Sequence, residues 1–133
     1  MTIDLDTALQ PLRLFVRGGF RYAAEDAPDG LPADAPRGGT LVLVGNAGAA
    51  LWDAFARNAD RGVRHPLDGW LRPALERIAS EAGATALFPN EGPPFVPLHD
   101  WAMRAEPVHR SPIGILIHPE YGLWHVYRAA FLF

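Results

Sequence analysis

An arginine near the carboxyl end is the first candidate for chemistry, because it stands among apolar residues in a segment that alternates like a β-strand. Side chains alternate along a strand. One face of this strand is expected to carry Trp124, Val126, Arg128 and Ala130, and the other His125, Tyr127, Ala129, Phe131 and Phe133. Because a buried charge without a partner is costly, Arg128 needs one. Two interpretations stay open: a structural role, in a salt bridge within the chain or reaching solvent, and a clamp for an anion or amide of a ligand.

Two histidines flank the turn that precedes this strand. His118 and His125 are expected to share a face of a hairpin, diagonal to one another. Such a pair could bind a metal, but no third ligand of suitable reach is evident, so turn capping or stacking on a ligand is the preferred role. No Ser-His-Asp order, nucleophile elbow or paired carboxylate spacing supports hydrolase chemistry.

A glycine-containing segment, Gly45-Asn46-Ala47-Gly48, follows the apolar run 40–44 and precedes a predicted helix at 51–59. A strand, a Gly turn and a helix N-terminus together form a generic anion cradle. The segment lacks both the GxGxxG spacing and the GK[ST] ending, so a plain βα turn is preferred over a phosphate site.

The elements expected to position these residues are short strands and amphipathic helices. Strands are predicted at 12–22, with a bulge or turn at Gly18-Gly19, at 40–44, covered on both faces, and at 84–88. The pattern predicts a turn at 65–68, a helix from Trp70 or Leu71 to a cap at Gly83, and a short helix at 98–105. The segment 113–133 reads as a β-hairpin around the turn 119–122.

This order of elements predicts a single α+β domain over residues 1–133, with a mainly antiparallel sheet and helices packed on it. The alternative is a three-layer α/β arrangement, since the order strand–helix–strand between 40 and 88 also suits a parallel pair.

Composition excludes several classes of protein. The chain has 133 residues, a net charge of −3 and no cysteine, so disulfides and iron–sulfur clusters held by this chain are excluded and nucleic acid or an anionic membrane is not an expected partner. No apolar run is long enough to span a bilayer, and the acidic start does not resemble a secretory signal. We therefore expect a cytoplasmic protein.

The run SPIGILIHPEYGLWHVYR, residues 111–128, resembles the hairpin of the CblC-type cobalamin-trafficking proteins. The residues that match this pattern are Gly114, His118, Pro119, Tyr121, Gly122, Trp124 and Arg128. The run is similar, more loosely, to epoxyqueuosine reductase. Bacterial ferredoxin-like proteins share further segments with this chain: HPLDGW at 65–70, GPPFVPL at 92–98 and RAEPVH at 104–109. The resemblance covers about half of the chain, from His65 onward.

This resemblance implies a nitroreductase-like fold with a corrinoid or flavin pocket above the sheet. Arg128 would contact amide or phosphate groups of the ligand, and Trp124 and Tyr121 would pack on it. His118 and Gly114 would belong to the same site, and Gly45, Asn46 and the 92–98 loop would supply backbone donors at its rim. In the ferredoxin-like proteins a Cys-rich cluster module follows the hairpin, so this chain would be a stand-alone protein or the N-terminal part of a longer one.

Three functions follow as hypotheses. The first is a cobalamin-binding module of a redox or trafficking protein, an oxidoreductase if it is an enzyme, which would work with a Cys-rich iron–sulfur module. The second is an FMN-dependent reductase of the nitroreductase type, whose flavin site a homodimer would complete. The third is a non-catalytic protein that dimerises through the edge of its last strand, 124–133.

Overall fold

An antiparallel four-stranded sheet lies at the centre of the protein. The structure, a computed structural model, describes residues 4–47, 66–89, 95–113, 115–122 and 125–133. The sheet has the order β1-β2-β6-β3, and every pair of neighbouring strands is antiparallel. Its strands are β1 (Phe15–Tyr22), β2 (Gly39–Ala47), β6 (His125–Leu132) and β3 (Thr85–Leu87). The expectation of an α+β protein with a mainly antiparallel sheet is therefore confirmed, because β6 separates β2 from β3 and no parallel pair forms between described strands.

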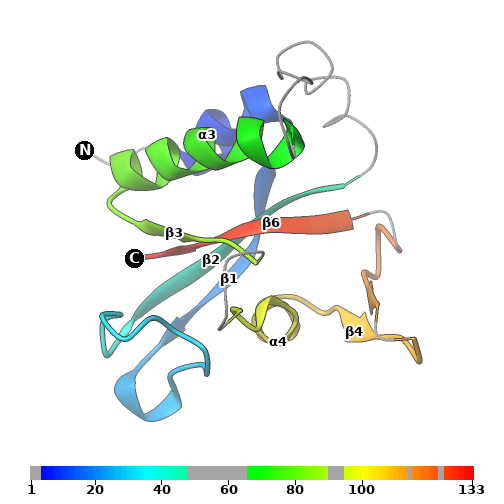
Figure 1. The fold of residues 1–133 in the computed structure, drawn as a ribbon. Coiled ribbons are helices and arrows are strands. Elements are labelled where there is room, and N and C mark those ends of the chain that lie inside the picture. The colour runs from blue at the N-terminus through cyan, green and yellow to red at the C-terminus, as the bar shows by residue number, and fades with distance from the viewer. Residues whose placement is uncertain (1–3, 48–65, 90–94, 114, 123–124) are drawn as a thin grey trace.

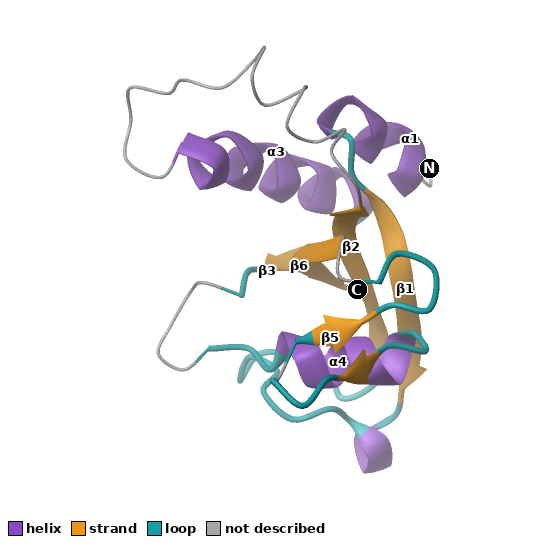
Figure 2. Ribbon diagram, turned by 90° about the vertical axis from the view of Figure 1, so that its right-hand side faces the viewer, coloured by secondary structure: helices purple, strands orange, loops and turns teal. Residues whose placement is uncertain are grey.

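Helices cover both faces of the sheet (Figures 1 and 2). On one face lie α1 (Leu5–Leu9) and α3 (Pro66–Ala82), and on the other α4 (Leu98–Ala105) with a small ribbon of β4 (His109–Arg110) and β5 (Leu116–Ile117). Two 3₁₀ helices flank β1, at Gln10–Leu12 and Ala24–Asp26. Residues 12–14 precede β1, so this strand begins at Phe15 and not at residue 12 as predicted. No described helix is both long and apolar enough to cross a bilayer.

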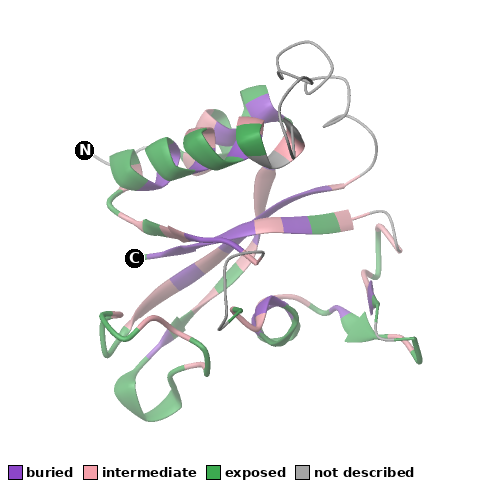
Figure 3. Cartoon of the chain, viewed as in Figure 1, coloured by how far each residue is buried: buried purple, intermediate pink, exposed green. Residues whose placement is uncertain are grey.

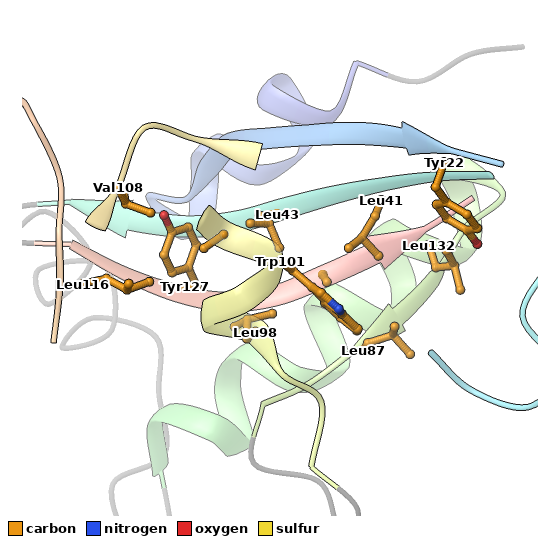
Figure 4. Packing of buried hydrophobic residues seen from close by; sticks show 12 residues of the cluster. Tyr22, Leu41, Leu43, Leu87, Leu98, Trp101, Val108, Leu116, Tyr127 and Leu132 are labelled. Carbon is orange, nitrogen blue, oxygen red and sulfur yellow. The ribbon is translucent and has the colours of Figure 1, made fainter. Parts of the chain in front are cut away.

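The sheet separates two apolar cores, and β2 contributes to both, as its continuous apolar run predicts. Val44 packs with α1 and α3, while Leu41 and Leu43 pack with α4. Figure 3 shows the buried residues concentrated along the central strands and the inner sides of the helices. In the α4 core, Trp101 is 2 % exposed and lies close to Leu41 and Leu87 (Figure 4). Burial on both faces is what favours β2 and β6 as the inner strands.

Helix α3 begins earlier than the sequence pattern predicts. Residues 66–68 form its first turn, not a separate turn, and Pro73 lies inside the helix. An internal proline removes one backbone hydrogen bond, to the carbonyl of residue 69. Both Gly69 and Pro73 are exposed, so solvent can satisfy that carbonyl. Gly83, with φ of +81°, follows the helix as the predicted cap, and α4 has the predicted bounds.

The predicted hairpin is wrong in its pairing. Strand β5 pairs with β4, and among the described residues only the bridge between His118 and Gly122 joins the two sides of the turn. Strand β6 instead lies between β2 and β3, where both of its apolar faces are covered. Its segment Ala130–Leu132 is therefore not a free edge, which removes that part of the dimerisation surface expected at 124–133.

Candidate functional site

Two β-bulges place an arginine on each face of the sheet at the same end of β2. In β1 the pairing with β2 skips Arg17, next to the predicted glycine bulge, and in β6 it skips Arg128. An extra residue at a bulge interrupts the alternation of side chains. Arg128 and Ala129 therefore both lie toward α3, while Ala130 packs in the α4 core. This corrects the expectation that Arg128 and Ala130 share a face.

Asn46 connects the two arginines. It is 3 % exposed, its side-chain oxygen accepts a hydrogen bond from Arg128 Nε at 2.9 Å, and its backbone oxygen lies 3.5 Å from Arg17 Nη1. Residues Gly45–Ala47 belong to β2, so the predicted βα turn does not begin at Gly45. Gly45 is buried beneath β6, where a Cβ atom would overlap the carbonyl oxygen of Val126. The rest of the predicted cradle, including the helix at 51–59, lies outside the described residues.

A cavity of about 280 Å³ lies between α3 and β6, on the face that carries Arg128. Its walls are mostly apolar, with guanidinium groups from both sides: Leu71, Arg72, Leu75, Phe88, Pro89, Val126, Tyr127 and Arg128. Arg72 stacks on Phe88 and forms an ion pair with Glu76 at 2.9 Å. Strand β3 pairs with β6 only at Ala130–Leu132, so β6 extends past β3 (Figure 1). The cavity lies beside this extension, since Val126, Tyr127 and Arg128 line it. Apolar walls with a few convergent cations suit a mainly apolar ligand with an amide or anionic edge.

The opposite face carries a buried polar cluster centred on Arg17, whose side chain has no exposed surface. Glu106, directly after α4, lies 3.3 Å from Arg17 Nη2 and accepts a 2.5 Å hydrogen bond from the Tyr127 hydroxyl. The Arg17 guanidinium also lies over the Tyr127 ring, 4.5 Å from its centroid. Arg17 Nε has no hydrogen-bond partner among the described residues. The cluster thus holds one buried cation by one carboxylate and by aromatic rings.

His118 and His125 lie against this cluster. Their ring centroids are 5.7 Å apart, and His118 Nε2 is 3.8 Å from a Glu106 oxygen. Tyr121 stacks on His118 at 4.5 Å and lies 5.5 Å from the Arg17 guanidinium. The two histidines thus lie near one another, although the hairpin in which they were predicted to share a face does not form. No three His, Cys, Asp or Glu residues in the described part of the chain are grouped so that they could hold a metal ion.

Burial shifts the titration of two groups in the cluster. The pKa of His125 is lowered from its usual 6.5, mainly by burial and further by the charge of Arg17. The pKa of Tyr127 is raised, mainly by burial and then by its hydrogen bond to Glu106. Desolvation disfavours the charged form of each group. At neutral pH the imidazole and the phenol are therefore both uncharged, and the buried charges are those of Arg17 and Glu106.

We expect acid to destabilise the protein through His125. Because the folded state lowers its pKa below 6.5, the unfolded chain binds this proton more readily. The contribution of His125 to the free energy of unfolding is therefore complete above pH 6.5. It is lost as the pH falls from 6.5 through the pKa that His125 has in the folded state. Urea unfolding measured at several pH values should show a fall in the free energy of unfolding below about pH 6.5 that is smaller in the variant His125→Gln. An equal fall in both proteins would contradict the assignment.

The site residues predicted from the sequence divide between the two faces. Arg128, Asn46 and Gly45 come together beside the cavity, whereas His118 and Tyr121 lie across the sheet against Arg17. The predicted contacts of Trp124 and Gly114 fall outside the described residues. Sequence reasoning missed Arg17, Glu106 and Tyr127; the one available signal was the glycine pair after Arg17, which marks the bulge.

No protein-family model matches the chain, and no curated protein is similar to it at a significant level.

Proposed function

We propose that this chain is a corrinoid-binding module of a redox or trafficking protein, of the CblC or epoxyqueuosine-reductase kind, with a nitroreductase-like fold. The resemblance of residues 111–128 motivates the proposal. The observation that carries it is the position of Arg128: this residue lines the cavity between α3 and β6, and its Nε donates a hydrogen bond to the side-chain oxygen of buried Asn46.

The chemistry of the cavity fits the periphery of a corrinoid. The rim of the macrocycle bears carboxamides, and cobalamin also bears a phosphate; guanidinium groups donate to both kinds of oxygen. A cavity of about 280 Å³ is at the lower limit for a drug-sized ligand. It would therefore take a side chain or one edge of the corrinoid, while the ring would extend over Val126, which is 42 % exposed.

In this proposal the described residues bind and orient the ligand and exclude water from one edge of it. The cobalt would supply the redox or alkyl-transfer chemistry when bound. Since the chain has no cysteine, an iron–sulfur electron donor would belong to a Cys-rich module or a partner protein.

The test is co-elution of the ligand with the purified protein. We expect hydroxocobalamin to remain bound through gel filtration, as judged by its visible spectrum, and FMN to be lost. Bound FMN would favour a flavin reductase instead, and a dimer that binds neither ligand would favour the non-catalytic protein. Either of these results would overturn the corrinoid proposal.

Arg128→Ala tests the residue itself. Loss of hydrogen bonds from a charged donor is expected to weaken cobalamin binding about tenfold or more, measured by spectral titration, while the circular dichroism spectrum is retained. The matched control is Arg77→Ala, an exposed arginine on α3, which should bind as the unmodified protein does. Unchanged affinity in Arg128→Ala would place the ligand elsewhere, and an unfolded variant would make Arg128 structural.

A further inference from the structure

The turn between His118 and Gly122 is closed by two kinds of hydrogen bond. His118 and Gly122 exchange both backbone hydrogen bonds at 2.9 Å, and Gly122 has a φ of +59°. The Nδ1 atom of His118 accepts from the backbone N–H groups of Glu120 and Tyr121, at 3.0 and 3.1 Å. Because a backbone N–H can only donate, Nδ1 must carry its lone pair. The ring proton is therefore on Nε2, which faces Glu106.

His125 is held in the same tautomer by different partners. Its Nε2 lies 3.0 Å from the backbone oxygen of Leu116, which can only accept. Its Nδ1 lies 3.1 Å from Arg17 Nη2, which can only donate. The neutral ring thus links β5 to the buried arginine of β1, and both of its nitrogens are already used.

A second proton on either ring would have to occupy Nδ1, where a hydrogen-bond donor already points. On His125 the new charge would also face the guanidinium of Arg17. We propose that protonation of His118 and His125 releases the 118–122 turn from the α4 face of the sheet, so that this turn responds to acid. The inference concerns the folded protein itself and does not depend on corrinoid binding.

The other groups around the histidines do not compensate for these losses. Arg17 from β1 repels a charged ring. Tyr127 from β6 is a neutral phenol in this pH range, and Tyr121 from the turn contributes the ring that stacks on His118. Glu106, after α4, serves Arg17 and Tyr127 through Oε2, and its Oε1 lies 3.8 Å from His118 Nε2. Its attraction for a protonated His118 ring does not give the N–H groups of Glu120 and Tyr121 a new acceptor. The low pKa of His125 agrees with this balance.

Hydrogen exchange measured by NMR tests the proposal. Between about pH 7.5 and about pH 5, the amides of Glu120, Tyr121 and Gly122 should lose about tenfold or more of their protection after correction for intrinsic exchange, since one pKa unit corresponds to a factor of ten. The amides of Ala130 and Phe131, in the central strand β6, should show a smaller loss. Unchanged protection of the turn, or an equal loss in the turn and β6, would overturn the proposal.

Substitutions distinguish the protonation of His118 and His125 from other effects of low pH on the protein. His118→Asn retains an acceptor for the turn, and His125→Gln retains a donor to Leu116, but neither side chain titrates. The double variant should keep equal protection of the turn at both pH values, whereas His99→Asn, at an exposed histidine of α4, should behave as the unmodified protein does. An acid response in the double variant would contradict the proposal.

If the double variant does not fold, the imidazole ¹⁵N shifts of the unmodified protein decide the matter. Both rings should be neutral Nε2–H tautomers at about pH 7.5, and should become protonated over the pH range in which the turn loses protection. An Nδ1–H tautomer, or rings that stay neutral while the turn opens, would overturn the proposal.

Discussion

Glu106→Gln is expected to lower the free energy of unfolding by about 3 kcal/mol, because it removes the only carboxylate found within ion-pair distance of buried Arg17 among the described residues. The two side chains are 0 % and 9 % exposed, so solvent cannot replace the lost charge. Gln has nearly the same shape, and Arg17 keeps the Tyr127 ring and several neutral acceptors. The loss should therefore lie at the lower end of the values for broken buried pairs, about 3–5 kcal/mol. Urea unfolding followed by circular dichroism measures it.

Glu76→Gln is the matched control. Glu76 pairs with Arg72 at 2.9 Å, but these side chains are about half exposed, so the change should cost less than about 0.5 kcal/mol. Adding Arg17→Met to Glu106→Gln removes the buried charge itself and should recover part of the lost stability. Equal losses of stability in Glu106→Gln and Glu76→Gln would show that the buried ion pair contributes no more to the free energy of unfolding than the exposed one.

Gly45→Ala is expected to cost about 2–3 kcal/mol, because the new methyl group has no room. Its Cβ would overlap the carbonyl oxygen of Val126 and lie 3.1 Å from the Cα of Tyr127. These are backbone atoms of a paired strand, so β6 can yield only by moving away from β2 beside its bulge. We expect the same movement to weaken the hydrogen bond between Arg128 and Asn46, which the NMR signals of the Asn46 side-chain amide would report.

Gly38→Ala is the control for the loss of glycine flexibility. Gly38 is exposed, and the nearest atom to its Cβ position is 3.3 Å away. This variant should change stability by less than about 1 kcal/mol. If both variants are equally stable, the close approach of β6 to Gly45 does not constrain the sheet.

Local signals in the sequence were enough for the buried face of α3, the bounds of α4 and the apolar character of the strands, whereas α1 was not predicted. The apolar spacing on α3 predicts the burial of Leu71, Leu75, Ile78 and Ala79, and all four are buried. The bounds of α4 and the cap at Gly83 were also predicted correctly, because periodicity and capping act within a few residues. The early start of α3 was missed, because the prediction placed Pro73 in the first turn, whereas the structure has it inside the helix.

Strand pairing could not be predicted in the same way. Adjacent segments β5 and β6 resemble a hairpin, yet β6 gains more by lying between β2 and β3, where both of its faces are covered. Strand pairing depends on the burial of segments that are distant in the sequence. A turn signal involves only neighbouring residues, so it carries no information about that burial. The turn at 118–122 forms all the same, because its hydrogen bonds are local.

The order of apolar and turn residues in the sequence favoured helices packed on a mainly antiparallel sheet, but it left a parallel pair between residues 40 and 88 as the alternative. The lack of cysteine determined that these 133 residues cannot ligate an iron–sulfur cluster through thiolates. The sequence also marked Arg128 as a charged residue among apolar neighbours, and Asn46 as part of a glycine-containing segment. Only the tertiary structure decided that these two residues are partners, that Arg17 and Glu106 form a second buried cluster, and that the two arginines lie on opposite faces. The physical reason is the pair of bulges: one extra residue in each of β1 and β6 shifts the alternation of the side chains that follow it, and a bulge depends on how a strand pairs with a neighbour distant in sequence.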